Sequence, residues 1–383
     1  MTPLCGDTFA GQASASLRGE VMARMTREEQ FAPDEIAIVH VMNRLIRNCY
    51  LMGEDPLTGK NFDHRKGWVE KELERVAPHF GIDLFAYAIL SNHFHLVLRS
   101  RPDIVRTWDD FEVARRWMTL CPKRKKKDGS PQPPNDREIN AIRCNAKKLA
   151  DIRSRLSDIS WWMRLICQRI AQKANAEEEQ AGKFWQARYK AVRLLDEEAL
   201  LACTAYVDLN PIRAALAETL ETSDYTSVQR RITALRDGLK GETANRPMNH
   251  APVTGVSSPS VYSILAPIEI DELNDPLGPR PATNGQRCSD KGILPMPLAA
   301  YLELLDWTAR QIIPGKRGAT QASVPTLLTR LKIRPEVWCE LVSQFGRLFS
   351  LVAGQPHRVD EHRGRLTEKR FFLRSSTREL LCS

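Results

Sequence analysis

Paired cysteines and long apolar segments are missing from this sequence. No apolar run approaches the length of a membrane-spanning helix, and the N-terminus lacks the basic start and apolar stretch of a secretory signal. The nine cysteines form no C-x-x-C pair and have no regular spacing, which argues against a zinc ribbon and against a disulfide framework. We therefore expect a cytoplasmic protein with reduced thiols and no membrane partner.

The composition is otherwise that of an ordinary globular protein with an excess of positive charge. A length of 383 residues and a hydrophobic content of 42% allow two or three domains with buried cores. The net charge of +9 favours association with polyanions, and nucleic acid is the first candidate. Neither number decides between a monomer and a homodimer.

Histidine is scarce, yet two of the eight histidines stand one residue apart in the stretch AYAILSNHFHLVLR, residues 86–99. Two apolar runs flank Ser91 and Asn92, which predicts two strands joined by a tight turn. Side chains alternate along a strand, so His93 and His95 share a face, with Cα atoms roughly 6.6 Å apart. Two imidazoles at this spacing can converge on one metal ion. The open alternative is that both simply lie at a sheet surface.

The surrounding pattern predicts an α+β fold. Two helices and four strands in this order match a split βαβ arrangement, that is, a ferredoxin-like antiparallel sheet with helices. The first strand carries His40, a possible partner of the later histidines, although a plain sheet histidine is the simpler interpretation. The elements are a strand at 35–46, a helix at 64–79, the hairpin at 86–99, a long helical region at 136–180 that breaks near Ser157, and a strand at 184–195.

Positive charge is concentrated after the hairpin. Residues 99–155 hold 16 Lys or Arg against 8 Asp or Glu, which accounts for +8 of the net charge. The excess peaks in a run that enters a Pro-rich stretch, and this predicts an inserted flexible loop near 120–136 that either contacts phosphates or is merely solvated. The same two alternatives apply to three cations of the fourth strand. The candidate DNA-binding residues are Lys123, Arg124, Lys125, Lys126, Lys127, Arg188, Lys190 and Arg193.

An acidic helix start, Asp196-Glu197-Glu198, follows the fourth strand and precedes ALLACTAYVDLN. Tyr206 and Asn210 are four residues apart, so they share one face of this helix. Asn210 and Pro211 can end the helix and begin the next one.

Several of these motifs occur together in one known family. NHFHLVL after an AYAIL strand, then GKFWQARYKAV, AYVDLNPIRAAL and DYTSV, resemble the single-tyrosine HUH transposases, most closely the REP-associated tyrosine transposases. The resemblance covers roughly residues 36–235. It implies that His93, His95 and Asn210 hold a divalent metal, Mg²⁺ or Mn²⁺, and that Tyr206 is the nucleophile. The basic insertion and the long C-terminal extension depart from the family pattern.

The implied activity is cleavage and rejoining of single-stranded or hairpin DNA through a 5′-phosphotyrosine. Tyr189 and Tyr87 are competing nucleophiles, but both fall in predicted strands, where aromatic residues usually pack. Two other functions remain open. A DNA-binding regulator on the same fold would form no covalent adduct, and a metal-dependent phosphoesterase that uses water would not need Tyr206.

Composition divides the chain into four parts. Residues 1–30 predict a loosely ordered lead-in, 31–240 the catalytic domain, 241–290 a linker rich in Pro, Ser, Asn and Gly, and 291–383 a helical accessory domain with a basic tail. All candidate catalytic residues precede the linker. We therefore expect residues 1–240 to suffice for the chemistry.

Overall fold

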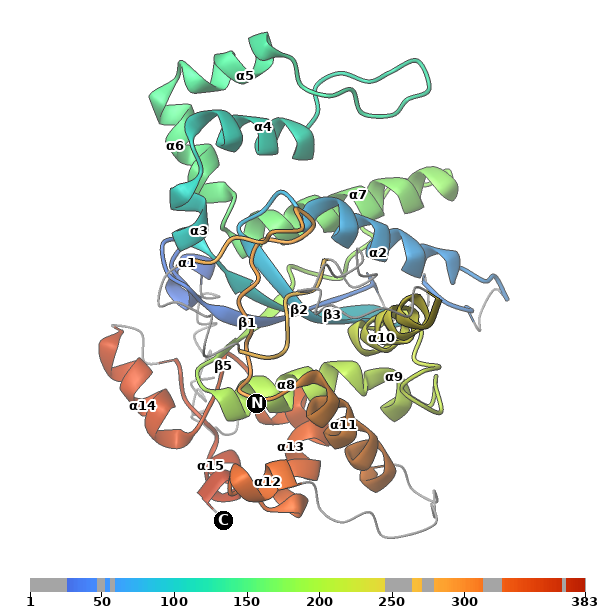
Figure 1. The fold of residues 1–383 in the computed structure, drawn as a ribbon, viewed down its shortest axis with the longest axis vertical. Coiled ribbons are helices and arrows are strands. Elements are labelled where there is room, and N and C mark those ends of the chain that lie inside the picture. Colours follow the sequence, from blue (N-terminus) through green and yellow to red (C-terminus); the bar gives the residue numbers. More distant parts are fainter. Residues whose placement is uncertain are drawn as a thin grey trace, which may run out of the picture.

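The structure is a computed structural model that describes residues 26–46, 52–55, 59–244, 264–270, 279–312, 326–366 and 370–382. Its centre is a five-stranded sheet with the order β2-β3-β1-β4-β5 (Figure 1). Neighbouring strands are antiparallel except β4 and β5, which are parallel. Helices cover both faces, so the predicted mixed α+β class is confirmed. The strands are β1 (Ile38–Arg44), β2 (Ile82–Ile89), β3 (His93–Ser100), β4 (Lys190–Leu194) and β5 (Val352–Ala353).

The two faces of the sheet contact two separate apolar cores. Phe94, Leu96 and Leu98 of β3 belong to the core beneath α2 (His64–Val76) and α7 (Ile159–Glu177). Val97 belongs to the core beneath α8 (Glu197–Asp208) on the opposite face. Alternation along the strand produces this separation, as the sequence predicts.

Helix α8 begins at the position that the acidic start indicates. The Asp196 carboxylate accepts a hydrogen bond from the backbone N–H of Ala199 at 2.9 Å, and Glu197 and Glu198 lie in the first turn, where negative charge favours the helix dipole. The helix lies across β2 and β3 (Figure 1). Two further helices follow, α9 (Asn210–Arg213) and α10 (Ser227–Ala244).

The predicted loop is present, because residues 121–135 contain no helix, and the helices on both sides of it form a separate layer. This layer lies beyond α2 and α7, on the side of the sheet opposite to α8 (Figure 1). Asn135 and Glu138 form a capping box at the start of one helix, and Asp158 caps α7, which explains the break predicted near Ser157. The helices of this layer are α4 (Asp110–Leu120), α5 (Asp136–Arg143) and α6 (Ala146–Arg155), and α3 (Pro102–Thr107) precedes them.

The C-terminal part packs directly against α8 and extends the sheet. Trp338, Leu341, Val342 and Phe345 belong to the same apolar core as α8, and β5 pairs with β4. The predicted accessory domain is thus helical, but it shares a core with the part that carries Tyr206. Its helices are α11 (Leu298–Ile312), α12 (Thr326–Arg330), α13 (Pro335–Leu348), α14 (Pro356–Arg365) and α15 (Ser375–Cys382).

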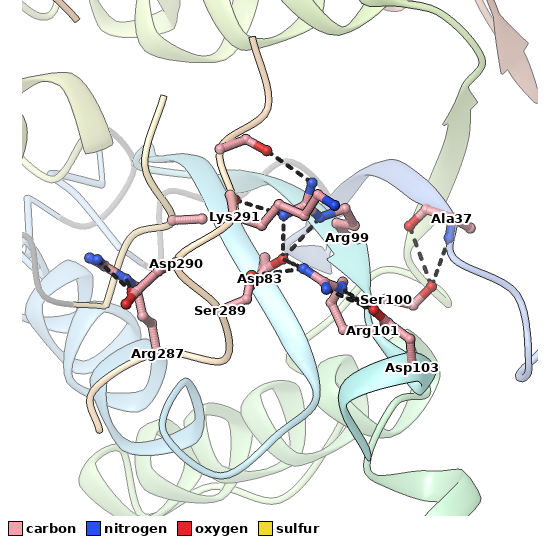
Figure 2. A network of polar contacts seen from close by, with 12 residues as sticks. Ala37, Asp83, Arg99, Ser100, Arg101, Asp103, Arg287, Ser289, Asp290 and Lys291 are labelled. Atoms are coloured by element: carbon pink, nitrogen blue, oxygen red, sulfur yellow. Dashed lines mark hydrogen bonds and ion pairs between the residues drawn. The ribbon is translucent and has the colours of Figure 1, made fainter. Parts of the chain in front are cut away.

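The described residues of the predicted linker are also packed. Asp83 of β2 is buried and pairs with Arg99 at 2.8 Å, and it accepts a hydrogen bond from Ser289 at 2.7 Å (Figure 2). Arg99 also donates to the backbone oxygens of Lys291 and Gly292. A Cβ at Gly292 would lie 1.9 Å from the Glu269 backbone oxygen, so only glycine fits this approach. These contacts hold the described residues of this segment against the sheet.

Some sequence-based expectations fall outside the described residues. Residues 1–25 of the predicted lead-in do so, as do 245–263 and 271–278 of the predicted linker. Residues 27–30 form the short helix α1 (Arg27–Gln30), which is capped by Thr26. Across the described ranges, no helix is both long and apolar enough to span a membrane.

Candidate functional site

Three histidines gather on the sheet face that α8 covers. His40 of β1 and His95 of β3 are buried, and His93 at the start of β3 is partly exposed. Nε2 of His40 lies 2.9 Å from Nδ1 of His95, and the two rings stack with centroids 5.1 Å apart. The ring centroids of His93 and His95 are 4.8 Å apart. The structure thus places His93 and His95 together, and His40 joins them from the neighbouring strand.

Hydrogen bonds leave one nitrogen of each hairpin histidine available. Nδ1 of His93 donates to the Asn92 side-chain oxygen at 2.5 Å, so Nε2 of His93 carries the lone pair. Nε2 of His95 is buried and has no hydrogen-bond partner among the described residues. A buried polar atom without a partner is costly and therefore calls for an explanation.

All three histidines are neutral at pH 7. Burial lowers the pKa of His40 to about 4, with the charge of His93 as a smaller cause. Burial likewise lowers the pKa of His93 to about 4, with a smaller effect of the Arg44 charge. The pKa of His95 falls well below its usual value, again mainly through burial. Neutral imidazole is the form that binds metal ions.

Tyr206 projects from the last turns of α8 toward these histidines. Its ring centroid lies 5.4 Å from that of His95 and 5.9 Å from that of His40, both in edge-on geometry. Burial raises the pKa of Tyr206, while the charge of Arg213 and hydrogen bonds from Arg213 and Asn210 oppose that rise. The side chain is thus mostly desolvated, but two polar groups favour its ionised form.

Arg213 and Asn210 come from α9, directly after the helix that carries Tyr206. Asn210 is buried, and the guanidinium carbon of Arg213 lies 4.7 Å from the centroid of the Tyr206 ring. Arg213 was not among the residues predicted from the sequence. Arg213 stands seven residues after Tyr206, a separation that places two residues on one face of a helix, so its spacing was a signal that could have indicated it.

A divalent metal at this site would have few protein ligands. Within the described part of the chain, no three His, Cys, Asp or Glu side chains form a metal-holding group. A metal here would instead be held by His93, His95 and Asn210, and the orphaned Nε2 of His95 matches such a ligand. His40 would then accept a hydrogen bond from Nδ1 of His95 and orient that ring, as the outer partners of metal-bound histidines do.

The C-terminal part closes the site from the other side. The ring of Phe345 lies 5.7 Å from the ring of Tyr206 and 6.0 Å from that of His40. A Cβ at Gly346 would lie 3.0 Å from the Tyr206 hydroxyl oxygen, which is tighter than ordinary contact. Phe345 and Gly346 lie more than a hundred residues after Tyr206, and no local pattern signalled that they belong to the site.

The two competing tyrosines lie elsewhere. Tyr87 and Tyr189 belong to the core on the α2 and α7 side of the sheet, opposite to Tyr206 and the histidines. Tyr87 donates a hydrogen bond to Glu70, and the Tyr189 hydroxyl lies 3.1 Å from that of Ser160. Burial raises the pKa of both. Of the three tyrosines considered, only Tyr206 shares a face with the histidines.

The three cations predicted around the fourth strand, Arg188, Lys190 and Arg193, lie in different environments. Arg193 pairs with Glu35, and this partner lowers the pKa of that carboxyl. Arg188 lines a cavity on the α7 side. Lys190 is exposed and lines the cavity that contains Tyr206. The structure therefore brings only Lys190 of these three to the candidate site.

The basic run lies in the connection between α4 and α5, far from α8 in the arrangement of layers (Figure 1). Lys123, Lys125, Lys126 and Lys127 are exposed, whereas Arg124 pairs with Glu138 at 3.1 Å. Arg124 is therefore engaged within the protein, and four lysines are accessible to phosphates rather than all five cations.

Replacing these four lysines by glutamine is expected to weaken binding of single-stranded DNA without changing preference among sequences. Each lost phosphate contact should lower the slope of log K against log salt by about 0.7. A salt series of fluorescence-anisotropy titrations with two unrelated oligonucleotides measures both quantities. An unchanged slope would mean that the run is only a solvated loop.

In chemical terms the site is a partly buried tyrosine beside two imidazoles that each have an available nitrogen, next to a cavity that Lys190 lines. No family model and no curated protein matches this chain. Among solved structures, it is similar to a REP-associated tyrosine transposase bound to a REP hairpin, at 11% identity and a TM-score of 0.30. That alignment covers 58% of this chain and 90% of the other. A likeness this distant carries no argument about function.

Proposed function

We propose that this protein cleaves and rejoins single-stranded DNA through a covalent 5′-phosphotyrosine at Tyr206. The observation that carries the proposal is the approach of Tyr206 to His95, with 5.4 Å between ring centroids, from an element far along the chain. His93, His95 and Asn210 hold a divalent metal, Mg²⁺ or Mn²⁺, and the substrate lies at hairpins or palindromic repeats. The protein is then a transposase of the HUH class.

The residues supply the parts that phosphodiester cleavage requires. The Tyr206 oxygen attacks phosphorus, a new P–O bond to the tyrosine forms, and the bond to the 3′ oxygen breaks. The tyrosine proton passes to solvent or to a base, and the released 3′ oxygen takes up a proton. Arg213 supports the ionised tyrosine. A bound metal would polarise the phosphate oxygens and orient the scissile group.

The covalent intermediate explains how rejoining proceeds without an external energy source. The phosphotyrosine ester retains the energy of the original diester, so a 3′ hydroxyl can reverse the attack and restore the backbone. Water would waste that bond, and the partial burial of Tyr206 beneath Phe345 limits its access.

Strand order supports the finer fold assignment. The sheet places β1 between β3 and β4, with β2 beyond β3, which is the arrangement expected of a ferredoxin-like βαββαβ unit. The helix that carries Tyr206 then covers the face to which the two hairpin histidines point. This topology brings the histidines and Tyr206 together, although α8 follows the last strand of that unit.

Incubation of the full chain with single-stranded oligonucleotides and Mn²⁺ tests the proposal. A denaturing gel should show a protein–DNA adduct of the size expected for one strand attached to one chain, and EDTA should prevent it. Cleavage without an adduct would favour the water-dependent phosphoesterase. DNA binding without cleavage on hairpin and linear substrates would favour the non-catalytic regulator.

The metal ligands can be tested independently of cleavage. His93→Ala and His95→Ala are each expected to lower Mn²⁺ affinity by more than the roughly 10–100-fold typical for loss of an outer-shell partner, and to abolish adduct formation. Asn210→Ala should have a smaller effect, because an amide oxygen contributes less to the site than an imidazole. Isothermal titration with Mn²⁺ measures the affinities.

His357→Ala is the matched control, because His357 is exposed on α14 and lies outside the site. It should bind Mn²⁺ like the unmodified protein. Unchanged Mn²⁺ affinity in the double variant of His93 and His95 would reject the metal site.

A further inference from the structure

A cavity of about 500 Å³ opens beside Tyr206, between the sheet and the C-terminal part. Its lining includes His40, His95 and Tyr206, and the C-terminal part contributes Gly346, Arg347, Phe349, Ser350, Leu351, Arg370 and Arg374. The volume is within the range of about 300–1,000 Å³ that is usual for ligand pockets. The cavity therefore has room for a ligand next to the Tyr206 ring.

The wall of this cavity is strongly cationic. Five Lys or Arg side chains line it, and among the described residues the lining contains neither Asp nor Glu. Lys190, Arg347 and Arg374 are exposed, and the described residues provide no carboxylate partner for these three. Like charges repel, so a cluster of this kind favours an anionic ligand. The five are Arg27, Lys190, Arg347, Arg370 and Arg374.

Backbone hydrogen bonds join two of the segments that carry these cations. Arg347 follows Phe345, whose ring packs on Tyr206, at the end of α13. The backbone N–H of Arg193 donates to the Leu351 oxygen at 2.9 Å, and that of Leu195 donates to the Ala353 oxygen at 3.0 Å. These bonds join the segment after α13 to the strand that bears Lys190. The segment after Arg347 and the strand of Lys190 are thus fixed relative to each other.

We propose that this cavity is a phosphate-binding site for the single-stranded DNA that leads to Tyr206, with Arg347 and Arg374 as contributions of the C-terminal part. The inference rests on the proposed function, because it takes the strand at Tyr206 as the ligand. Guanidinium groups bind phosphate oxygens in pairs of parallel hydrogen bonds, and cationic grooves follow the backbone of single strands. Consecutive phosphodiesters meet these requirements without any particular base sequence.

The test compares two triple variants, both carrying Tyr206→Phe so that only binding is measured. One is Lys190→Gln/Arg347→Gln/Arg374→Gln. The other, Lys71→Gln/Lys147→Gln/Lys332→Gln, removes the same charge from exposed lysines that do not line the cavity. The probe is a fluorescein-labelled single-stranded 30-mer of mixed sequence, titrated at several KCl concentrations, with the corresponding duplex as a second probe.

For the single-stranded probe, the slope of log K against log salt is expected to be smaller in the cavity variant by about 0.7 for each lost phosphate contact. The loss of three contacts should therefore lower the slope by about two. The slope should change much less in the control variant, and the slope for the duplex probe should change much less in the cavity variant. Equal slopes in the two variants, or a loss confined to the duplex, would overturn the inference. All six positions are exposed, so a cooperative melt near that of the parent confirms that both variants are folded.

Failure of this site and failure of the proposed function give different results. An adduct formed by the unmodified chain, together with equal slopes, rejects the phosphate site and keeps the tyrosine chemistry. A selective loss of slope in a protein that forms no adduct supports the phosphate site and rejects the chemistry.

Discussion

Tyr206→Phe is expected to abolish adduct formation, with a fall in cleavage rate on the order of 10⁴-fold or more, the scale of losing a nucleophile in covalent catalysis. The substitution removes one oxygen and keeps the ring that packs between His95 and Phe345. The affinity for single-stranded DNA should therefore be almost unchanged. A quench series on a denaturing gel gives the rate, and anisotropy gives the affinity.

Tyr87→Phe and Tyr189→Phe are the matched controls. Each removes a phenolic oxygen from the opposite face of the sheet, where Tyr87 hydrogen-bonds with Glu70 and Arg230 and Tyr189 with Ser160. Both variants should still form the adduct, with at most about 1–3 kcal/mol of destabilisation from the unpaired group. An adduct that persists in Tyr206→Phe, and disappears in one of these two, would assign the nucleophile to another tyrosine.

The side chains on the sheet face that carries the histidines could largely be predicted from the sequence, because they follow from patterns between neighbouring residues. Alternation along residues 93–98 determines which side chains share a face, and the two apolar cores follow the same alternation. The acidic start of α8 likewise predicts its first turn. Whether His93, His95 and Asn210 bind a metal, and whether Tyr206 is the nucleophile, stay predictions until the experiments above are done.

Other features could not be predicted because they depend on contacts between distant segments. His40 looked like an ordinary sheet histidine, since only the pairing of β1 with β3 reveals its hydrogen bond to His95. The helical insertion did leave one signal, because Asn135 and Glu138 have the spacing of a capping box. The lysine run and the prolines after it indicated the loop at 121–135, whereas the helices α3 and α4 before the run were not predicted.

The role of the C-terminal part illustrates the limit of composition. Pro, Gly, Ser and Asn predict turns, but they do not reveal that Asp83, Arg99 and Ser289 hold those turns against the sheet (Figure 2). The sequence predicted a helical part at 291–383, but not that the apolar face of α13 covers α8. The expectation that residues 1–240 suffice for the chemistry rested on the position of the candidate catalytic residues and on the linker composition, and the shared core leads us to the opposite expectation.

Removal of residues 245–383 is expected to abolish both cooperative folding and adduct formation. Truncation would expose the α8 surface now covered by Trp338, Leu341 and Phe345, and would remove β5 from the sheet edge. Burial of each large apolar side chain contributes about 1.5–3 kcal/mol. A domain is stable by only about 5–15 kcal/mol, so loss of several such contacts removes most of that margin. Circular dichroism during heating measures the transition.

A point variant distinguishes the contribution of the C-terminal part to the Tyr206 site from its contribution to the stability of the whole fold. Phe345→Ala in the full chain should cost about 3–5 kcal/mol of stability and should slow adduct formation, because the ring that packs against Tyr206 and His40 is lost. Phe372→Ala is the control, since Phe372 is exposed in the same part of the chain and should change neither quantity. A chain of residues 1–244 that melts cooperatively and still forms the adduct would show that the C-terminal part is an accessory, as composition alone suggested.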